Sequence, residues 1–348
     1  MTSRIEKGGA QFAGITLLLC ENPLPPLDEA IAAARAVLPR SNHYTEPFSA
    51  PLRAALARQL GVPERLLHLN AGSELILRQL FDRFGQQVHL FTPTYALFPE
   101  IARSYTEMYL LPEDGFTLDL SQVTLPAGTT LAVIVNPNNP NGGTCNMTPL
   151  PELLRRYPDT YFLVDEAFID LGGQSVVSLV PQYANLLVTR TLSKAHSLAG
   201  FRVGYAVLPE PLADDLNAHN DAYPLATPSQ AAALATLEHM DKIEQRIHML
   251  KHWTRELASE LAQLGIKTYP TETYFFLADF APYTGKEIAD ALAAERILVK
   301  PLDVPRLGAG FIRMTTAVPE DNAKVLRVLK HFLKETSPMR HTFQHLRA

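Results

Sequence analysis

One lysine in this chain stands among hydroxyl and guanidinium groups at short spacing. Lys194 follows Ser193, with Thr191 just before the pair and Arg202 eight residues on. Desolvation and neighbouring charge can lower the pKa of a lysine, and the neutral amine then attacks a carbonyl carbon to form an imine. Arg202 and the two hydroxyls could bind a phosphate group. Pyridoxal phosphate (PLP) carries both an aldehyde and a phosphate; an ordinary solvated turn before a helix is the alternative.

An acidic pair ends the apolar run upstream of that lysine. The run 161–164 is typical of a buried strand, and Asp165 and Glu166 follow it at once. In open α/β sheets, ligands bind beyond the carboxyl ends of the strands, which is where these acids fall. A carboxylate there can pair with a protonated pyridine nitrogen and make the ring an electron sink. A metal ligand and a helix cap are the alternatives.

A turn-rich loop closes a second apolar run. Residues 133–135 read as a buried strand, and the sequence N-P-N-N-P-N-G-G at 136–143 stops it. An asparagine amide at a strand end can donate a hydrogen bond to a ring oxygen, although turn chemistry alone explains most such loops. The three clusters in this order are harder to explain without a shared ligand.

With these motifs, the chain resembles the fold-type I PLP enzymes of aminotransferase class I/II. It is most similar to histidinol-phosphate aminotransferases and threonine-phosphate decarboxylases. The motifs are N-P-N-N-P-x-G, D-E-A-[YF], and S-K with an arginine eight residues later, and the likeness runs from about residue 19 to 322. The resemblance implies that Lys194 forms the Schiff base and shuttles a proton. It further implies that Asp165 pairs with the pyridine nitrogen and that Asn139 donates to the ring 3-oxygen.

The resemblance assigns further contacts to the cofactor and the substrate. Residues 71–74 read as a strand-turn-helix junction, and N–H groups at a helix start bind phosphate. Tyr95 would stack on the ring, and Tyr44 would reach the phosphate of a partner subunit, which implies a homodimer. Arg313 would bind the substrate α-carboxylate. The other expected cofactor contacts are Gly72, Ser73, Glu74, Phe168, Thr191, Ser193 and Arg202, and the other expected substrate contacts are Asn22 and Tyr274.

Three positions depart from the family pattern. Phe168 replaces the usual tyrosine of D-E-A-Y, so a second donor to the 3-oxygen is absent. Asn141 replaces a threonine in a turn, and Tyr274 stands where histidinol-phosphate enzymes usually carry asparagine. Phenylalanine at 168 also occurs in the decarboxylase branch and in some aminotransferases, so it does not assign the reaction.

Composition indicates an ordinary globular protein. The 348 residues are 47% hydrophobic and 19% charged, and a net charge of -5 argues against a nucleic-acid or membrane partner. Cys20 and Cys145 are far apart and lack metal-ligand spacing. His248 and His252 are spaced for a helical metal pair, but no acid or cysteine completes a motif, so we expect no metal. His196 is expected at the rim of the cofactor pocket. We expect a cytoplasmic enzyme.

Alternating patterns predict an α/β fold of the fold-type I kind. Helix-like and strand-like stretches alternate between about residues 50 and 210, which predicts a mostly parallel, seven-stranded sheet between helices. One long helical pattern from Ser229 to Leu264 leads into a small α+β domain. The expected divisions are 1–40, an N-terminal segment packing with the small domain; 41–230, the large PLP-binding domain; 231–336, the small domain; and 337–348, a tail.

The favoured function is that of a PLP-dependent aminotransferase. The resemblance implies transfer of an amino group between an amino acid, or an amino-acid-like phosphate such as histidinol phosphate, and a 2-oxo acid. A decarboxylase of a phosphorylated amino acid on the same scaffold is the first alternative, because both reactions use Lys194 and Asp165. A non-catalytic PLP-binding regulator is the second, and the absence of a basic face and of a helix-turn-helix pattern disfavours it.

Overall fold

The computed structural model describes residues 12–302, 304 and 306–344, with side chains up to residue 336. Contacts divide the chain into two compact units. The large unit comprises residues 24–139 and 143–247, and the small unit comprises residues 1–23, 140–142 and 248–348.

The limits of these two units differ from the predicted domain limits. By contacts, residues 24–40 belong to the large unit, where α1 (Asp28–Val37) packs on α7 (Thr227–Leu237). Whether the expected domain limits at residues 40 and 230 hold for independently folding domains stays a prediction. The predicted tail lies partly outside the described residues, and α10 (Pro319–Gln344) continues through it to Gln344.

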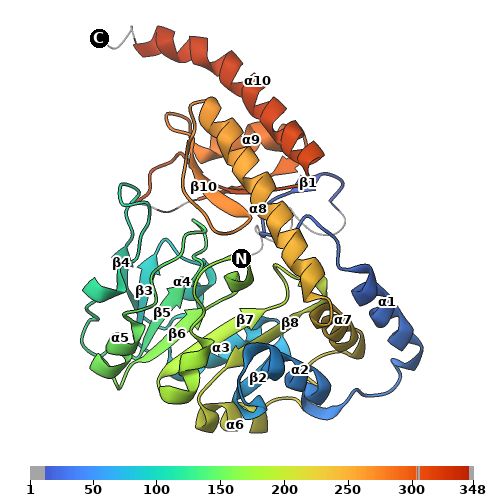
Figure 1. Cartoon of the computed structure of the whole chain (residues 1–348). Coiled ribbons are helices and arrows are strands. Elements are labelled where there is room, and N and C mark those ends of the chain that lie inside the picture. Colours follow the sequence, from blue (N-terminus) through green and yellow to red (C-terminus); the bar gives the residue numbers. More distant parts are fainter. Residues whose placement is uncertain (1–11, 303, 305, 345–348) are drawn as a thin grey trace. The chain divides into compact units, whose positions relative to one another are not determined.

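The large unit is built on a seven-stranded sheet (Figure 1), which confirms the predicted architecture. Its strand order is β2-β8-β7-β6-β5-β3-β4. All neighbours run parallel except β8, which is antiparallel to β2 and β7. The strands are β2 (Leu67–Ala71), β3 (Val88–Thr92), β4 (Tyr105–Tyr109), β5 (Leu131–Val135), β6 (Tyr161–Asp165), β7 (Leu186–Thr191) and β8 (Val203–Val207).

Burial explains why the central strands read as unbroken apolar runs. Every residue of β5, β7 and β8 is buried, as expected for a sheet covered on both faces. One face packs against α3 (Ser73–Phe84), α4 (Leu97–Ile101) and α6 (Glu210–Ala218). The remaining α-helices with predominantly large-unit residues are α2 (Ala50–Leu60) and α5 (Leu150–Arg156), besides α1 and α7.

The small unit has the predicted α+β character. Its antiparallel sheet has the order β12-β13-β10-β9, and β1 pairs with β11 in a separate parallel ladder. Its core includes Phe276, Ile288, Ile312 and Val325. The strands are β1 (Ile15–Thr16), β9 (Lys267–Thr268), β10 (Phe275–Asp279), β11 (Ile297–Leu298), β12 (Lys300–Pro301) and β13 (Phe311–Thr315), and α9 (Gly285–Ala294) and α10 are its helices.

The long helical pattern is two helices, so the expectation of one continuous helix is wrong. α7 ends at Leu237 and α8 (Met240–Gln263) begins after a short turn. The His239 N–H donates to the Thr236 carbonyl at 3.0 Å, a tight turn that neither glycine nor proline marks. The boundary between the two units falls within α8.

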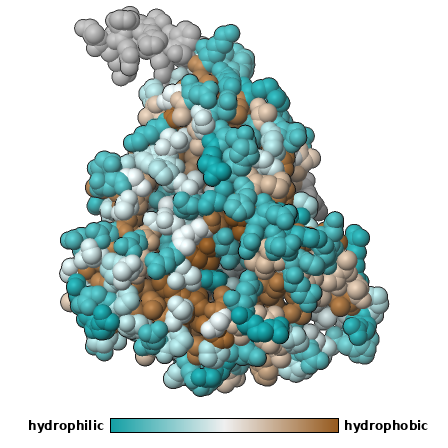
Figure 2. Space-filling model, in the orientation of Figure 1, coloured by the Kyte–Doolittle hydropathy of each residue, from teal (hydrophilic) through white to brown (hydrophobic). Residues whose placement is uncertain are grey.

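Hydrophilic and hydrophobic residues are interspersed on the face that Figure 2 shows. Among the described residues, no helix combines the length and the apolar character that crossing a membrane requires. Several large hydrophobic side chains of the large unit are exposed, and Tyr44 is the most exposed of them at 83%. Its ring stacks on Tyr223 with centroids 4.5 Å apart.

Candidate active site

Three adjacent strands of the large sheet bring the predicted cofactor residues to one edge. Asp165 ends β6 and lies in register with Val135 of β5 and Thr189 of β7. Lys194 follows the end of β7, and Asn139 lies in the loop after β5. The Asn136 N–H donates to the Asp165 carbonyl at 3.0 Å, which ties that loop to β6. The carboxyl-end placement predicted for these residues is therefore observed.

Asp165 is a buried carboxylate with a perturbed pKa. Burial raises the pKa of its carboxyl to about 6, against the opposing effect of a hydrogen bond from the Thr189 hydroxyl at 3.1 Å. The charge of Lys194 and the Ala167 N–H also favour the ionised form, but they do not outweigh desolvation. A protonated ring nitrogen beside this carboxylate would supply the counter-charge, so Asp165 fits PLP.

Lys194 is half-buried in a tight turn. Its Nζ lies 5.5 Å from the centroid of the Phe168 ring, and Phe168 itself is buried. Ser197 closes the turn by donating its N–H to the Lys194 carbonyl at 3.2 Å, and its φ of 59° is left-handed. Lys194 therefore faces an aromatic ring and not the tyrosine hydroxyl that is usual in the family.

The junction before α3 forms a cradle that suits a phosphate group. Gly72 has a φ of 87°, and a Cβ there would lie 2.1 Å from Nη2 of Arg202. A Cβ on Gly204 would lie 2.1 Å from the Ser73 nitrogen. The guanidinium thus lies against the first turn of α3, whose N–H groups and dipole favour an anion. These two glycines permit a close approach that any other residue would block.

The other predicted phosphate contacts are Thr191, Ser193 and Glu74. Thr191 and Ser193 are buried, and their hydroxyls lie 2.9 Å apart. The Glu74 carboxylate pairs with Arg78 one turn along α3, with Oε1 and Nη2 2.7 Å apart. Because a carboxylate repels a phosphate, Glu74 would offer such a group its backbone N–H and not its side chain.

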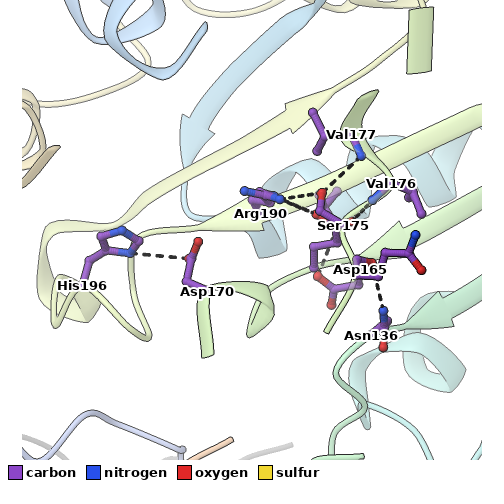
Figure 3. A network of polar contacts seen from close by, with 11 residues as sticks. Asn136, Asp165, Asp170, Ser175, Val176, Val177, Arg190 and His196 are labelled. Atoms are coloured by element: carbon purple, nitrogen blue, oxygen red, sulfur yellow. Dashed lines mark hydrogen bonds and ion pairs between the residues drawn. The ribbon is translucent and has the colours of Figure 1, made fainter. Parts of the chain in front are cut away.

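A buried ion pair supports the turn that follows Asp165, and the sequence interpretation missed it. Arg190 lies beside Ser175 (Figure 3), and its Nε donates to Glu166 Oε2 at 2.8 Å; the Ser175 hydroxyl donates to the same oxygen at 2.9 Å. The Val176 N–H binds the other oxygen at 2.7 Å. In the sequence, this ion pair is indicated by the acid directly after Asp165, but the partner of that acid, Arg190, lies on the neighbouring strand β7.

His196 is buried, and its expected place at the rim of the cofactor pocket stays a prediction. Only 2% of its surface is accessible, and burial lowers the pKa of its imidazole. Its Nδ1 lies 3.8 Å from Asp170 Oδ2 (Figure 3), and neither ring nitrogen has a hydrogen-bond partner.

The two aromatic residues expected at the cofactor lie in the large unit. Tyr95 is half-buried, and its ring meets Phe98 edge-on with centroids 5.6 Å apart. Tyr44 is exposed and stacks on Tyr223. These distances do not test whether either ring contacts a cofactor, so both assignments stay predictions.

The three predicted substrate residues all belong to the small unit. Arg313 on β13 is buried, donates from Nη2 to the Leu18 carbonyl, and lies with Cζ 5.7 Å from the Phe275 ring centroid. The Tyr274 hydroxyl donates to the Cys20 carbonyl at 2.7 Å and is fully buried. Asn22 is half-buried.

Lys300 is a candidate binding residue that the sequence interpretation missed. It pairs in register with Arg313, so the two cations stand on the same face of the small sheet. Lys300 begins β12, and only the strand register reveals its neighbour. Two adjacent cations favour a ligand with substantial negative charge.

No group of histidine, cysteine and acidic residues suited to a metal ion occurs in the part of the chain that the structure describes. His252 of the suggested metal pair instead lies with Nε2 3.3 Å from Glu256 Oε1 on an exposed stretch of α8.

Comparison with known proteins identifies the family. The model of aminotransferase class I and II matches residues 15–329. The chain belongs to this family. A histidinol-phosphate aminotransferase of Acinetobacter baumannii (strain SDF) is 30% identical over 322 residues, covering 89% of this chain and 88% of the relative.

Two solved structures share the fold. The histidinol-phosphate aminotransferase from Sinorhizobium meliloti, in complex with pyridoxal-5'-phosphate, has a TM-score of 0.82 and 21% identity, covering 92% of this chain and 91% of that one. The L-threonine-O-3-phosphate decarboxylase from Porphyromonas gingivalis has a TM-score of 0.82 and 22% identity, covering 92% and 99%. The expected fold type, the PLP cofactor and the assignment to the PLP-dependent aminotransferases are thereby confirmed.

Proposed function

We propose that this aminotransferase acts on a phosphorylated amino compound, such as histidinol phosphate, with a 2-oxo acid as the amino acceptor. The observation that carries the proposal is the Lys300–Arg313 pair on one face of the small sheet. Arg313 offers a planar fork to a carboxylate or phosphate, and Lys300 adds a second positive charge. The names of relatives such as the A. baumannii enzyme support the same substrate class.

The side chains of the large unit are suited to hold PLP and to move a proton. Bound PLP supplies an electron-withdrawing ring that stabilises negative charge at the substrate Cα. Asp165 maintains the positive charge of the ring nitrogen, and Arg202 with the start of α3 anchors the phosphate. The Lys194 amine would accept a proton from the substrate Cα and deliver it to C4′, the cofactor carbon that carries the aldehyde in free PLP. Asn139 donates to the ring 3-oxygen.

Transamination retains the carboxylate of an amino-acid substrate, whereas decarboxylation releases it as CO2. The purified PLP-loaded protein should be incubated with histidinol phosphate, with amino acids and with O-phospho-amino acids, each with 2-oxo acids. Mass spectrometry should then find pyridoxamine phosphate and an oxo product that retains every carbon of the donor. Stoichiometric CO2 without pyridoxamine phosphate would instead establish a decarboxylase. Bound PLP with no turnover of any donor would indicate a regulator.

We also propose that the enzyme is a cytoplasmic homodimer in which Tyr44 reaches the partner's cofactor phosphate. Tyr44 is 83% exposed, and Phe48 and Tyr223 nearby in the large unit are exposed as well. Exposed apolar groups gathered in one region are typical of interaction surfaces. The free thiols of Cys20 and Cys145 suit a reducing compartment. Light scattering tests the dimer, and Tyr44→Phe should weaken PLP binding if its hydroxyl reaches the phosphate.

A further inference from the structure

Three side chains of the small sheet bind the backbone of one segment near the N-terminus. We name residues 17–22 the N-terminal strap. The Thr315 hydroxyl donates to the Leu17 carbonyl at 3.2 Å, and Arg313 donates to the Leu18 carbonyl. The Tyr274 hydroxyl donates to the Cys20 carbonyl at 2.7 Å. Side chains from β13 and from the residue before β10 thus fix three carbonyls of the strap.

The strap begins where a backbone ladder ends. β1 pairs with β11, and the Leu17 N–H continues this pairing by donating to the Leu298 carbonyl at 2.8 Å. Beyond Leu17, the carbonyls of Leu18 and Cys20 accept from the side chains of Arg313 and Tyr274. Of the three donors, Tyr274 binds the carbonyl that is closest in sequence to Asn22, the strap residue expected to touch substrate.

The geometry at Cys20 shows what the Tyr274 bond stabilises. Cys20 has a φ of 50°, a left-handed conformation that is unfavourable for a residue other than glycine. Its side chain is 1% exposed, and Tyr274 is fully buried. A phenylalanine at 274 would leave the Cys20 carbonyl without this donor while the unfavourable backbone conformation remained.

Arg313 links the strap to the substrate. One nitrogen of its guanidinium donates to Leu18, and a guanidinium has five N–H donors in all, so a carboxylate can be bound at the same time. Burial raises the pKa of the Tyr274 phenol, and the positive charge of Arg313 opposes this shift. The position of the strap and the orientation of Arg313 are therefore coupled.

We propose that Tyr274 is a positioning residue that holds the strap in the place from which Asn22 and Arg313 bind substrate together. Tyr274 acts through the Cys20 carbonyl and, being fully buried with its hydroxyl bonded to that carbonyl, need not touch substrate itself. This inference rests on the proposed function, because it assumes that Arg313 and Asn22 are substrate contacts.

The test uses the PLP-loaded enzyme and two tyrosine variants. Tyr274→Phe removes the hydroxyl that binds the strap. Tyr283→Phe is the matched control, because Tyr283 is a buried tyrosine of the same unit whose hydroxyl accepts from Thr336 at 3.1 Å and does not bind the strap. A thiol reagent measures exposure of Cys20, and peptide mass spectrometry separates its modification from that of Cys145. Steady-state kinetics give KM and kcat for the amino donor.

Loss of one hydrogen bond is expected to raise both the Cys20 modification rate and KM by about five- to tenfold, with a smaller fall in kcat. Tyr283→Phe should match the wild type. Should Tyr274→Phe not fold, Thr315→Val removes the bond to Leu17 and should change both quantities in the same direction.

Two results would overturn the inference: a Cys20 rate in Tyr274→Phe equal to that in Tyr283→Phe, or faster modification with an unchanged KM. The second result would show a released strap that substrate does not need. If the wild type converts no donor while Cys20 rates still differ between variants, the proposed function fails, and the strap's role in substrate binding fails with it. This result differs from the two results named above, because in it the wild type itself is inactive.

Discussion

Asp165 should destabilise the cofactor-free protein, because its charge is buried without an adequate partner. Its pKa is raised from 3.8 to about 6, mainly by burial. Between these two values the folded state binds more protons than the unfolded state, so stability falls as the pH rises through this window. The full loss, reached above about pH 6, is about 3 kcal/mol at 1.36 kcal/mol per pKa unit.

Asp165→Asn should remove this penalty while losing part of the local hydrogen bonding. The Thr189 hydroxyl can still donate to the amide oxygen, but the amide NH2 cannot accept a second donor such as the Ala167 N–H. Subtracting about 1 kcal/mol for that hydrogen bond leaves the cofactor-free variant more stable than the wild type by about 2 kcal/mol at pH 8. The advantage should shrink as the pH falls from 6 to 4.

Urea unfolding of the cofactor-free proteins from pH 4.5 to 8 measures the effect. Asp82→Asn, at an exposed position of α3, makes the same charge change and should show no such pH-dependent gain. An Asp165→Asn advantage that does not vary with pH, or a variant less stable than the wild type at every pH, would refute the reasoning. Adding PLP should stabilise the wild type more than the variant, because the ring nitrogen then neutralises the carboxylate.

Three further predictions concern other parts of the site. Gly72→Ala should weaken PLP binding, because its Cβ would lie 2.1 Å from the Arg202 guanidinium; titration with PLP checks this, and unchanged affinity would contradict the cradle. Arg313→Lys should weaken substrate binding by about 1.5–3 kcal/mol, seen as a rise in KM, because lysine lacks the planar fork. Burial lowers the pKa of His196, so below about pH 6.5 the unfolded state binds the proton more readily and stability falls as the pH drops. His196→Phe should reduce that acid-side loss in urea unfolding at pH 5 relative to pH 8, and an equal loss in both proteins would count against it.

The cofactor half of the site could be predicted because its signals are local in sequence. Asp165, Asn139 and Lys194 each follow an apolar run within a few residues, and parallel strands place such positions at one edge of a sheet. β4 has no such signal, because it is an edge strand whose first three residues are exposed and no apolar run marks it. The break between α7 and α8 was missed because its turn contains no helix-breaking residue.

The contacts in the small unit could not be read from the sequence, because they depend on strand register and on distant segments. Lys300 meets Arg313 only through the pairing of β12 with β13. Tyr274 binds Cys20 across most of the chain length, and no pattern near either residue indicates the pairing. The hydroxyl of Tyr274 is bonded to the Cys20 carbonyl, and whether Tyr274 also contacts substrate stays a prediction.

The division of the chain into two units predicts two kinds of variant. The residues that we propose to hold PLP belong to the large unit, and the cationic face and the strap belong to the small unit. A change at Gly72 or Asp165 should therefore appear first in cofactor affinity or absorbance, whatever donor is supplied. A change at Lys300 or Tyr274 should leave cofactor binding intact and alter the dependence of rate on donor concentration. Since both classes can be measured in one purified protein, the cofactor chemistry can be established even before the physiological donor is known.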